Sequence, residues 1–403
     1  MAPPACPPRE RWARYSAFDG RRRAAGTSSR SSHASVIAKR YRRAVAARSG
    51  LRENGGPDGA RPHHVSPAAG LTLEIRFLSA DDVARVAPSN AELVAAIEAV
   101  VRAQGAGEVV LEPRVHLDPG ARFRGHWNVL RAFVAPLGVA GVKVVGDFVD
   151  NYRRDLPSEL GLLTLYDPDT GAPTAVVDAA DLTDRRTGAL TAVGAKHLAR
   201  PSSRVLGHVG ARGTAFWNVV LLDSLFDFEE IRVTSRRPES RTAFAAALER
   251  ELGKAVTACA TVQEVVEGAD VVVEATRLEA PEPILRTGWI AEGAFVVPYG
   301  TMSAVELDLL SIMDKVVVDD WGQCGPGNRL GALRAHVDAG ILTADTLHAE
   351  LGDVVVGRRP GRERDDERIL FWHRGLATCD VAIGALLVER AAAEGVGKIL
   401  RYR

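Results

Sequence analysis

Residues 205–222 read VLGHVGARGTAFWNVVLL, an apolar strand followed by a glycine-containing turn and an apolar helix. Glycine at such a turn lets the backbone bend tightly and approach a pyrophosphate, and the next helix offers free N–H groups to the phosphates. Gly210 and Gly213 are present, but Arg212 stands where the dinucleotide-binding motif has a further glycine. Taken alone, this imperfect motif is equally compatible with a structural turn.

Outward from this turn, strands and helices alternate along the chain. Short apolar runs typical of buried strands recur; they occupy residues 204–210, 230–235, 270–276, 293–298 and 315–320. The alternation predicts an α/β fold with a parallel, doubly wound, Rossmann-type sheet over residues 200–322, closed by residues 315–320. Because the glycine turn follows the first strand of this set, we interpret it as a dinucleotide-binding turn. Thr276, which ends the third strand, is expected at the same site.

The end of the second strand bears on the choice of dinucleotide. An acidic residue at this point would bind the ribose hydroxyls of NAD, but the chain reads VTSRR over residues 233–237. Ser235 is small and neutral, and the guanidinium groups of Arg236 and Arg237 can bind a 2′-phosphate. A solvated basic loop is the alternative. The pattern favours NADP(H), with NAD(H) possible.

The flanking regions predict further elements. Strands are expected at 108–113 and 141–146, helices at 179–199 and 376–394, the latter suited to packing or dimerisation. A helix over residues 90–103 is expected to have Asn90 as its N-cap. Residues 159–178 predict a β-hairpin around the turn sequence PDTG.

Composition excludes several classes of protein. The 403 residues hold 51 Lys and Arg against 51 Asp and Glu, and 46% are hydrophobic. A fully disordered chain and a strongly basic nucleic-acid binder are therefore excluded. Residues 1–70 hold 14 basic and 4 acidic residues. We interpret this segment as a disordered basic extension, with an organelle transit peptide as the alternative.

The cysteines and the hydropathy pattern bear on the compartment. Four widely separated cysteines show no ligand spacing, so we expect small buried thiols and neither disulfides nor a metal site; they are Cys6, Cys259, Cys324 and Cys379. No run approaches the roughly 18 apolar residues of a membrane helix. We expect a cytoplasmic protein with no membrane or nucleic-acid partner.

Several motifs, in order, resemble the ornithine cyclodeaminase/mu-crystallin family over about residues 71–397. The strongest is DPDTGAPTAVVDAADLTDRRTGALTAVGAKHLARP at 167–201. The others are PRVHL (113–117), GVKVV (141–145), ADVVVEAT (269–276), VELD (305–308), ELGDVVVG (350–357) and GLATCD (375–380). The resemblance implies a homodimer whose substrate and dimerisation domain, residues 71–199 and 323–403, surrounds an inserted Rossmann domain. It also implies nicotinamide-dependent chemistry at the α-carbon of an amino acid or imino acid.

The resemblance also assigns residues. Arg114 and Arg186 are expected to hold the substrate carboxylate, and Lys143 to lie near its amine or imine. Ser158, Gly213, Thr214 and His373 are expected near the cofactor.

Physical chemistry agrees with the first three roles. The planar fork of arginine matches a carboxylate. Lys143 lies in an apolar strand, so burial would lower its pKa and make it a usable proton donor or acceptor. The alternatives are a solvent-facing lysine on an edge strand and an ordinary surface arginine on a helix, which we expect Arg185 to be.

One departure from the family pattern concerns the reaction. Cyclodeaminases of this family place an Asp shortly before the segment that reads Glu306-Leu307 here, and Gly300 stands at that position. We expect no carboxylate to be available there. An imine reductase or amino-acid dehydrogenase is therefore favoured over an ornithine cyclodeaminase. The presence of Lys143, Arg114 and Arg186 argues against the third alternative, a catalytically silent cofactor-binding protein.

Three acidic residues have open roles. Asp319 and Asp320 could coordinate a cation or act as solvated caps. Asp380 could be a helix-dipole partner or a site residue.

Overall fold

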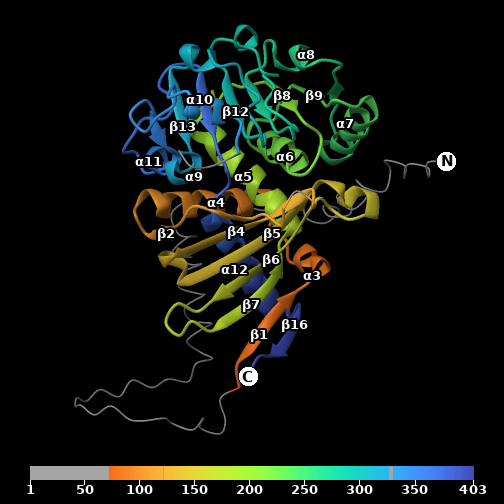
Figure 1. Cartoon of the computed structure of the whole chain (residues 1–403), viewed down its shortest axis with the longest axis vertical. Coiled ribbons are helices and arrows are strands. Elements are labelled where there is room, and N and C mark those ends of the chain that lie inside the picture. The colour runs from red at the N-terminus through yellow and green to blue at the C-terminus, as the bar shows by residue number, and fades with distance from the viewer. Residues whose placement is uncertain (1–71, 121, 326–329) are drawn as a thin grey trace, which may run out of the picture.

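The computed structural model describes residues 72–120, 122–325 and 330–403 (Figure 1). The basic extension proposed for residues 1–70 lies outside the described residues. Two eight-stranded sheets stand one above the other in Figure 1, with α4 (Asn90–Gly105) and α5 (Ala180–Leu198) between them.

The first sheet is mainly antiparallel. Its strand order is β16-β1-β7-β6-β5-β4-β2, and β3 pairs with β4. The bounds are β1 Glu74–Leu78, β2 Val109–Leu111, β3 Val115–Leu117, β4 Gly125–Val134, β5 Val139–Phe148, β6 Glu159–Tyr166, β7 Pro173–Asp178 and β16 Lys398–Arg401. The predicted hairpin is confirmed, since β6 and β7 pair antiparallel around the turn. Helix α12 (Ala377–Glu394) packs against β4, β5 and β6.

The second sheet is parallel throughout, which confirms the predicted α/β, Rossmann-type architecture. Its order is β10-β9-β8-β11-β12-β15-β13-β14. The bounds are β8 Val205–Val209, β9 Glu230–Thr234, β10 Thr257–Ala258, β11 Val271–Glu274, β12 Phe295–Pro298, β13 Lys315–Val318, β14 Ala349–Glu350 and β15 Ile369–Trp372.

The sheet does not close at residues 315–320, so this prediction was wrong. β15 lies between β12 and β13, and β14 pairs with β13. Residues as far as Trp372 therefore belong to the second sheet, beyond the expected limit of residue 322. β15 has only four residues, all buried, and so short an apolar run carries no periodicity that sequence could reveal.

Helices cover both sheets. The remaining ones are α3 Ala80–Arg85, α6 Ala215–Phe226, α7 Pro238–Leu252, α8 Val262–Val266, α9 Trp321–Cys324, α10 Arg334–Asp338 and α11 Leu351–Val355. The prediction of Asn90 as the N-cap of α4 was wrong: Asn90 is already helical, and Ser89 is the N-cap, forming a reciprocal capping box with Glu92. Among the described residues, no helix combines the length and hydropathy needed to cross a membrane. Cys259, Cys324 and Cys379 are buried, as expected, whereas Cys6 lies outside the described residues.

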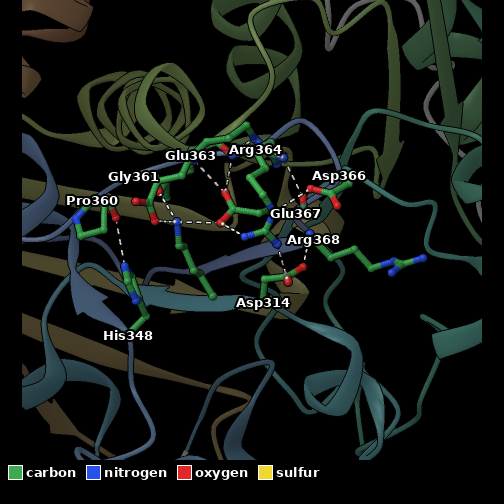
Figure 2. Close-up of polar contacts among 12 residues, drawn as sticks. Asp314, His348, Pro360, Gly361, Glu363, Arg364, Asp366, Glu367 and Arg368 are labelled. Carbon is green, nitrogen blue, oxygen red and sulfur yellow. Dashed lines mark hydrogen bonds and ion pairs between the residues drawn. The ribbon is translucent and has the colours of Figure 1, made fainter.

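A buried charge network fixes the loop before β15 (Figure 2). Lys315 Nζ lies 2.8 Å from carboxylate oxygens of both Glu363 and Glu367 and donates to the carbonyl of Gly361 at 2.6 Å. The Glu367 side chain is 2% exposed and also accepts the Glu363 backbone N–H at 2.8 Å. Such a buried carboxylate requires these partners, because an unpaired one would be strongly destabilising.

Candidate functional site

A large cavity opens between the two sheets. Its walls come from strands β3 to β6 of the first sheet and the start of α5. Its other wall is the carboxyl edge of the second sheet, where β8, β9, β11 and β12 end. Ligands of doubly wound sheets bind outside the carboxyl ends of the strands, so this cavity is the candidate site.

Two buried cations meet one carboxylate at the deep end of the cavity. Asp380 Oδ1 accepts from Lys143 Nζ at 2.7 Å and from Arg186 Nε at 2.7 Å. All three side chains are at most 6% exposed. Lys143 Nζ also donates to Thr183 Oγ1 at 3.1 Å. The structure thus joins β5, α5 and α12 through one ionic cluster, and places Asp380 in it.

The cluster perturbs its own ionisation. Burial, reinforced by the Arg186 charge and opposed by Asp380, lowers the pKa of Lys143 to about 8. Burial alone would raise the pKa of Asp380, but Arg186 and Lys143 outweigh it and hold that pKa below its usual value. The prediction of a buried lysine with a lowered pKa is therefore confirmed, and Lys143 can exchange a proton near neutral pH.

Arg114 reaches the same point from the start of β3. Its Nη2 donates to the Gly375 carbonyl at 2.9 Å and to the Arg374 carbonyl. A side chain at Gly375 would collide with the Arg186 guanidinium, and its φ of 80° also favours glycine. Burial and the charges of Arg374 and Arg186 lower the pKa of Arg114 to about 9. The structure therefore brings together Arg114, Arg186 and Lys143; their roles stay predictions.

Arg185 does not lie on the surface, so that prediction was wrong. It is 8% exposed, pairs with Asp181 at 2.6 Å, and its guanidinium carbon lies 3.8 Å from the centroid of the Trp217 ring. Helix α6 covers this face of α5, and no local sequence pattern indicates that packing.

The glycine turn borders the cavity as expected. Gly210 has a φ of 112°, and a Cβ there would lie 2.7 Å from the Ala275 carbonyl oxygen. Gly213 has a φ of 56°, and a Cβ there would lie 4.0 Å from Asp184 Oδ1, an ordinary contact distance. Thr214 Oγ1 lies 2.5 Å from the Tyr299 hydroxyl, which ties the turn to the end of β12. Arg212, which replaces a motif glycine, is exposed and lines the cavity.

The other predicted cofactor residues divide into two groups. Ser158, Ser235, Arg236, Arg237 and Thr276 all line the cavity. His373 is 1% exposed and lies beneath it, stacked on Tyr299 with the ring centroids 4.6 Å apart. His373 therefore reaches the cavity only through Tyr299, a residue that sequence reasoning did not assign to the site.

A carboxylate does lie beside Gly300, so the expectation of none there was wrong. Glu274, at the end of β11, is fully buried; its Oε2 accepts the Gly300 N–H at 3.2 Å and its Oε1 accepts the Thr276 N–H at 2.7 Å. Burial raises the pKa of Glu274 to about 7 despite these hydrogen bonds. Adjacent parallel strands bring the two residues together, and a Cβ at Gly300 would lie 2.6 Å from Glu274 Oε1.

Asp319 acts as a backbone partner in this structure. Its Oδ2 accepts the N–H groups of Arg374 and Gly375, both at 2.9 Å, and its Oδ1 accepts that of Asp320. Asp319 therefore holds the loop that carries Gly375, while the Asp320 side chain caps helix α9 by accepting the Gln323 N–H. Among the described residues, no group of three His, Cys, Asp or Glu side chains is placed to hold a metal ion.

Comparisons with known proteins agree with this geometry. The sequence model of the ornithine cyclodeaminase/mu-crystallin family matches residues 74–395, which confirms the predicted resemblance. The alanine dehydrogenase of Archaeoglobus fulgidus is 30% identical over 334 residues, covering 82% of this chain and 99% of the relative.

Two solved structures share the fold. The Δ1-pyrroline-2-carboxylate reductase of Thermococcus litoralis, solved with NADH and L-proline, is 26% identical with a TM-score of 0.76, over 80% of this chain and 99% of that one. An archaeal alanine dehydrogenase dimer with bound NAD is 28% identical with a TM-score of 0.75, over 82% and 100% of the two chains.

Proposed function

Because this chain belongs to the ornithine cyclodeaminase/mu-crystallin family, we propose that it is an NAD(P)(H)-dependent oxidoreductase acting at the α-carbon of an amino acid or its imine. The observation that carries this proposal is the cluster of Lys143, Arg186 and Asp380, with Arg114 beside it, in the same cavity as the glycine turn.

The cationic cluster fits an α-amino or α-imino acid. Arg114 and Arg186 carry fixed guanidinium groups that would bind the substrate carboxylate and so orient the α-carbon. Lys143, with a pKa of about 8, would hold or release a proton at the substrate nitrogen. Asp380 would position both Lys143 and Arg186, since one oxygen accepts from each.

The residues around the glycine turn fit a dinucleotide. Gly210 lets the turn pass close to the Ala275 backbone, Gly213 adopts the positive φ that the turn requires, and the N-terminus of α6 borders the cavity, where its free N–H groups could bind phosphates. Thr214 and Thr276 would lie along the bound cofactor, with Ser158 opposite on the first sheet. When bound, the nicotinamide supplies or accepts the hydride at the α-carbon.

The adenosine end favours NADP(H). Ser235 carries no charge to repel a phosphate, and Arg236 and Arg237 are exposed at the cavity wall. A charged hydrogen bond contributes about 1.5–3 kcal/mol, so one such bond would favour NADPH by about tenfold or more. Fluorescence titration should show tighter NADPH than NADH binding, with a smaller difference at high salt. Ser235→Asp combined with Arg236→Ala should reverse the order; tighter NADH binding by the unmodified chain would contradict the proposal.

A homodimer is part of the proposal. The face of the first sheet opposite Lys143 exposes an apolar patch formed by Val115, Leu117, Val144, Leu160 and Leu162, each at least 39% exposed. Contiguous apolar patches on a soluble surface mark contact sites, and the similar archaeal alanine dehydrogenase is a dimer. Sedimentation should give twice the chain mass of 43.1 kDa, and Leu162→Lys should shift it toward the monomer.

Steady-state assays separate this function from the alternative of cyclodeamination. An imine reductase or amino-acid dehydrogenase consumes or produces NAD(P)H stoichiometrically, whereas an ornithine cyclodeaminase releases proline and ammonia with only catalytic cofactor. Gly300 lacks a side chain for a distal amine, and the neighbouring Glu274 carboxylate is fully buried. Proline formation from ornithine without net cofactor turnover would show that the protein is a cyclodeaminase and would contradict the proposed function.

The Arg186→Ala variant tests the carboxylate-binding role of Arg186. If this variant turned over every active substrate with an unchanged KM, the role assigned to Arg186 would be wrong.

A further inference from the structure

Beyond the cationic cluster, the cavity has a second polar wall on the first sheet. His116 of β3 and Asn128 of β4 are cross-strand partners, and His126 lies two residues further along β4 on the same face. The imidazole centroids of His116 and His126 are 5.2 Å apart. All three side chains line the cavity, and none has a role in the function proposed above.

Two atoms of this wall lack hydrogen-bond partners. His116 Nε2 and Asn128 Oδ1 are both buried, and among the described residues neither has a partner at hydrogen-bond geometry. Burial lowers the pKa of the His116 and His126 imidazoles, and the Asn128 side chain lies close enough to each to oppose this shift, but not in a position to satisfy either atom fully. Buried polar atoms are nearly always satisfied, and an orphaned pair facing one cavity indicates a missing polar group. An amide oxygen accepts only, so the missing group must donate at least one hydrogen bond to Asn128.

The position of the wall relates it to the substrate. Leu130, two residues from Asn128 on the same face of β4, is the cross-strand partner of Lys143. Diagonal neighbours in an antiparallel pair have Cβ atoms about 7–8 Å apart. A substrate bound at Lys143 would therefore have the His116 and Asn128 wall on the same sheet face, one diagonal step along the strands.

The charges around the wall oppose a charged side chain. Burial, aided by the charge of Arg114, lowers the pKa of His116 to about 4, so its imidazole is neutral. Glu159 and Asp147 lie on the same sheet face, paired in register with each other, and Asp147 already pairs with Arg277. The wall therefore has neighbours of both signs, with Glu159 and Asp147 on one side and Arg114 on the other, so neither a carboxylate nor an ammonium group would be favoured by all of them.

We infer that His116 and Asn128 form a side-chain subsite, and that the substrate is an α-amino or α-imino acid whose side chain ends in an uncharged hydroxyl or carboxamide group. This inference rests on the proposed function. The terminal group donates one hydrogen bond to Asn128 Oδ1. At His116 Nε2, its oxygen accepts a hydrogen bond if that nitrogen is protonated, or its second hydrogen is donated if that nitrogen is not.

Matched substrates test the subsite. Homoserine and norvaline differ only by a hydroxyl in place of a methyl group, and serine and 2-aminobutyrate differ in the same way. A site built to hydrogen-bond a hydroxyl discriminates strongly against the analogue that lacks it. The wild-type kcat/KM should favour homoserine over norvaline by about tenfold or more. Asn128→Leu and His116→Phe should reduce this ratio to near one, whereas Val129→Ile, on the opposite face of β4, should retain it.

A binding measurement keeps the inference separate from the proposed function. Succinamate and levulinate are monocarboxylates of the same shape, of which only succinamate carries an amide N–H₂. Calorimetric titration should show tighter binding of succinamate, and Asn128→Leu should abolish the difference. If no amino acid is turned over but succinamate is preferred, the proposed function fails and the subsite stands. Equal wild-type values of kcat/KM and of the dissociation constant within each matched pair would overturn the inference of a subsite. A higher kcat/KM for glutamate or ornithine than for homoserine would also overturn it.

Discussion

Replacing Asp380 by Asn tests whether one carboxylate stabilises the two deepest cations of the cavity. Asp380 Oδ1 lies 2.7 Å from both Lys143 Nζ and Arg186 Nε, and its side chain is 0% exposed. Asparagine keeps the shape of the side chain but removes its charge. The substitution therefore leaves two buried cations without an ionic partner.

The structure sets the expected magnitude. Removal of one member of a buried ion pair costs about 3–5 kcal/mol, because the remaining charge stays desolvated. We expect Asp380→Asn to lower the free energy of unfolding by that amount. The pKa of Lys143, already lowered to about 8 by burial and Arg186, should fall further because Asp380 no longer raises it.

Urea denaturation at pH 7.5, followed by tryptophan fluorescence and circular dichroism, measures the loss. The double variant Asp380→Asn with Lys143→Met removes one orphaned cation and should recover about 1–2 kcal/mol, within the range of contacting residues. Asp227→Asn is the control: Asp227 also contacts a lysine, Lys254, but is 93% exposed, and its loss should leave the midpoint unchanged. A decrease below about 1 kcal/mol for Asp380→Asn would refute the reasoning, because surface pairs contribute that little.

Further predictions concern charge and packing. The pKa of Lys143 is 10.5 in the unfolded chain and about 8 in the folded chain, so between these pH values the unfolded chain binds more protons. The free energy of unfolding of the wild type should therefore rise with pH across this range, by about 3 kcal/mol relative to that of Lys143→Met. Urea titrations of both proteins at pH 7.5 and 10.5 check this rise, and parallel curves would contradict it. Glu367→Gln should lower the free energy of unfolding by about 3 kcal/mol, because Lys315, whose side chain is 7% exposed, loses one of its two carboxylate partners. A thermal melt measures this loss, and an unchanged Tm would show that Glu363 alone is a sufficient partner for Lys315. Gly300→Ala should weaken cofactor binding, because the added Cβ would lie 2.6 Å from Glu274 Oε1. Combining it with Glu274→Ala should restore cofactor binding. A cofactor dissociation constant unchanged by Gly300→Ala would show that the backbone at residue 300 shifts to accept the methyl group.

Features that depend on neighbours in the chain could be predicted from sequence. The turn at Gly210 needs a positive φ and a close backbone approach, so the glycines around it mark it. The hairpin at 159–178 follows from two alternating runs and a turn that satisfies its own hydrogen bonds. Strand alternation places Lys143 on the side of β5 opposite Val144, and the structure confirms its burial.

Features that depend on long-range pairing were decided only by the tertiary structure. The sequence contained Asp380, but its contact with Lys143 spans 237 residues, and no local pattern indicates which helix end meets which strand. The same holds for β15, which enters the second sheet between β12 and β13, and for Glu274, which adjacent strand ends bring against Gly300. Local periodicity determines which face of an element is buried, whereas the packing of the elements determines which charged groups meet there.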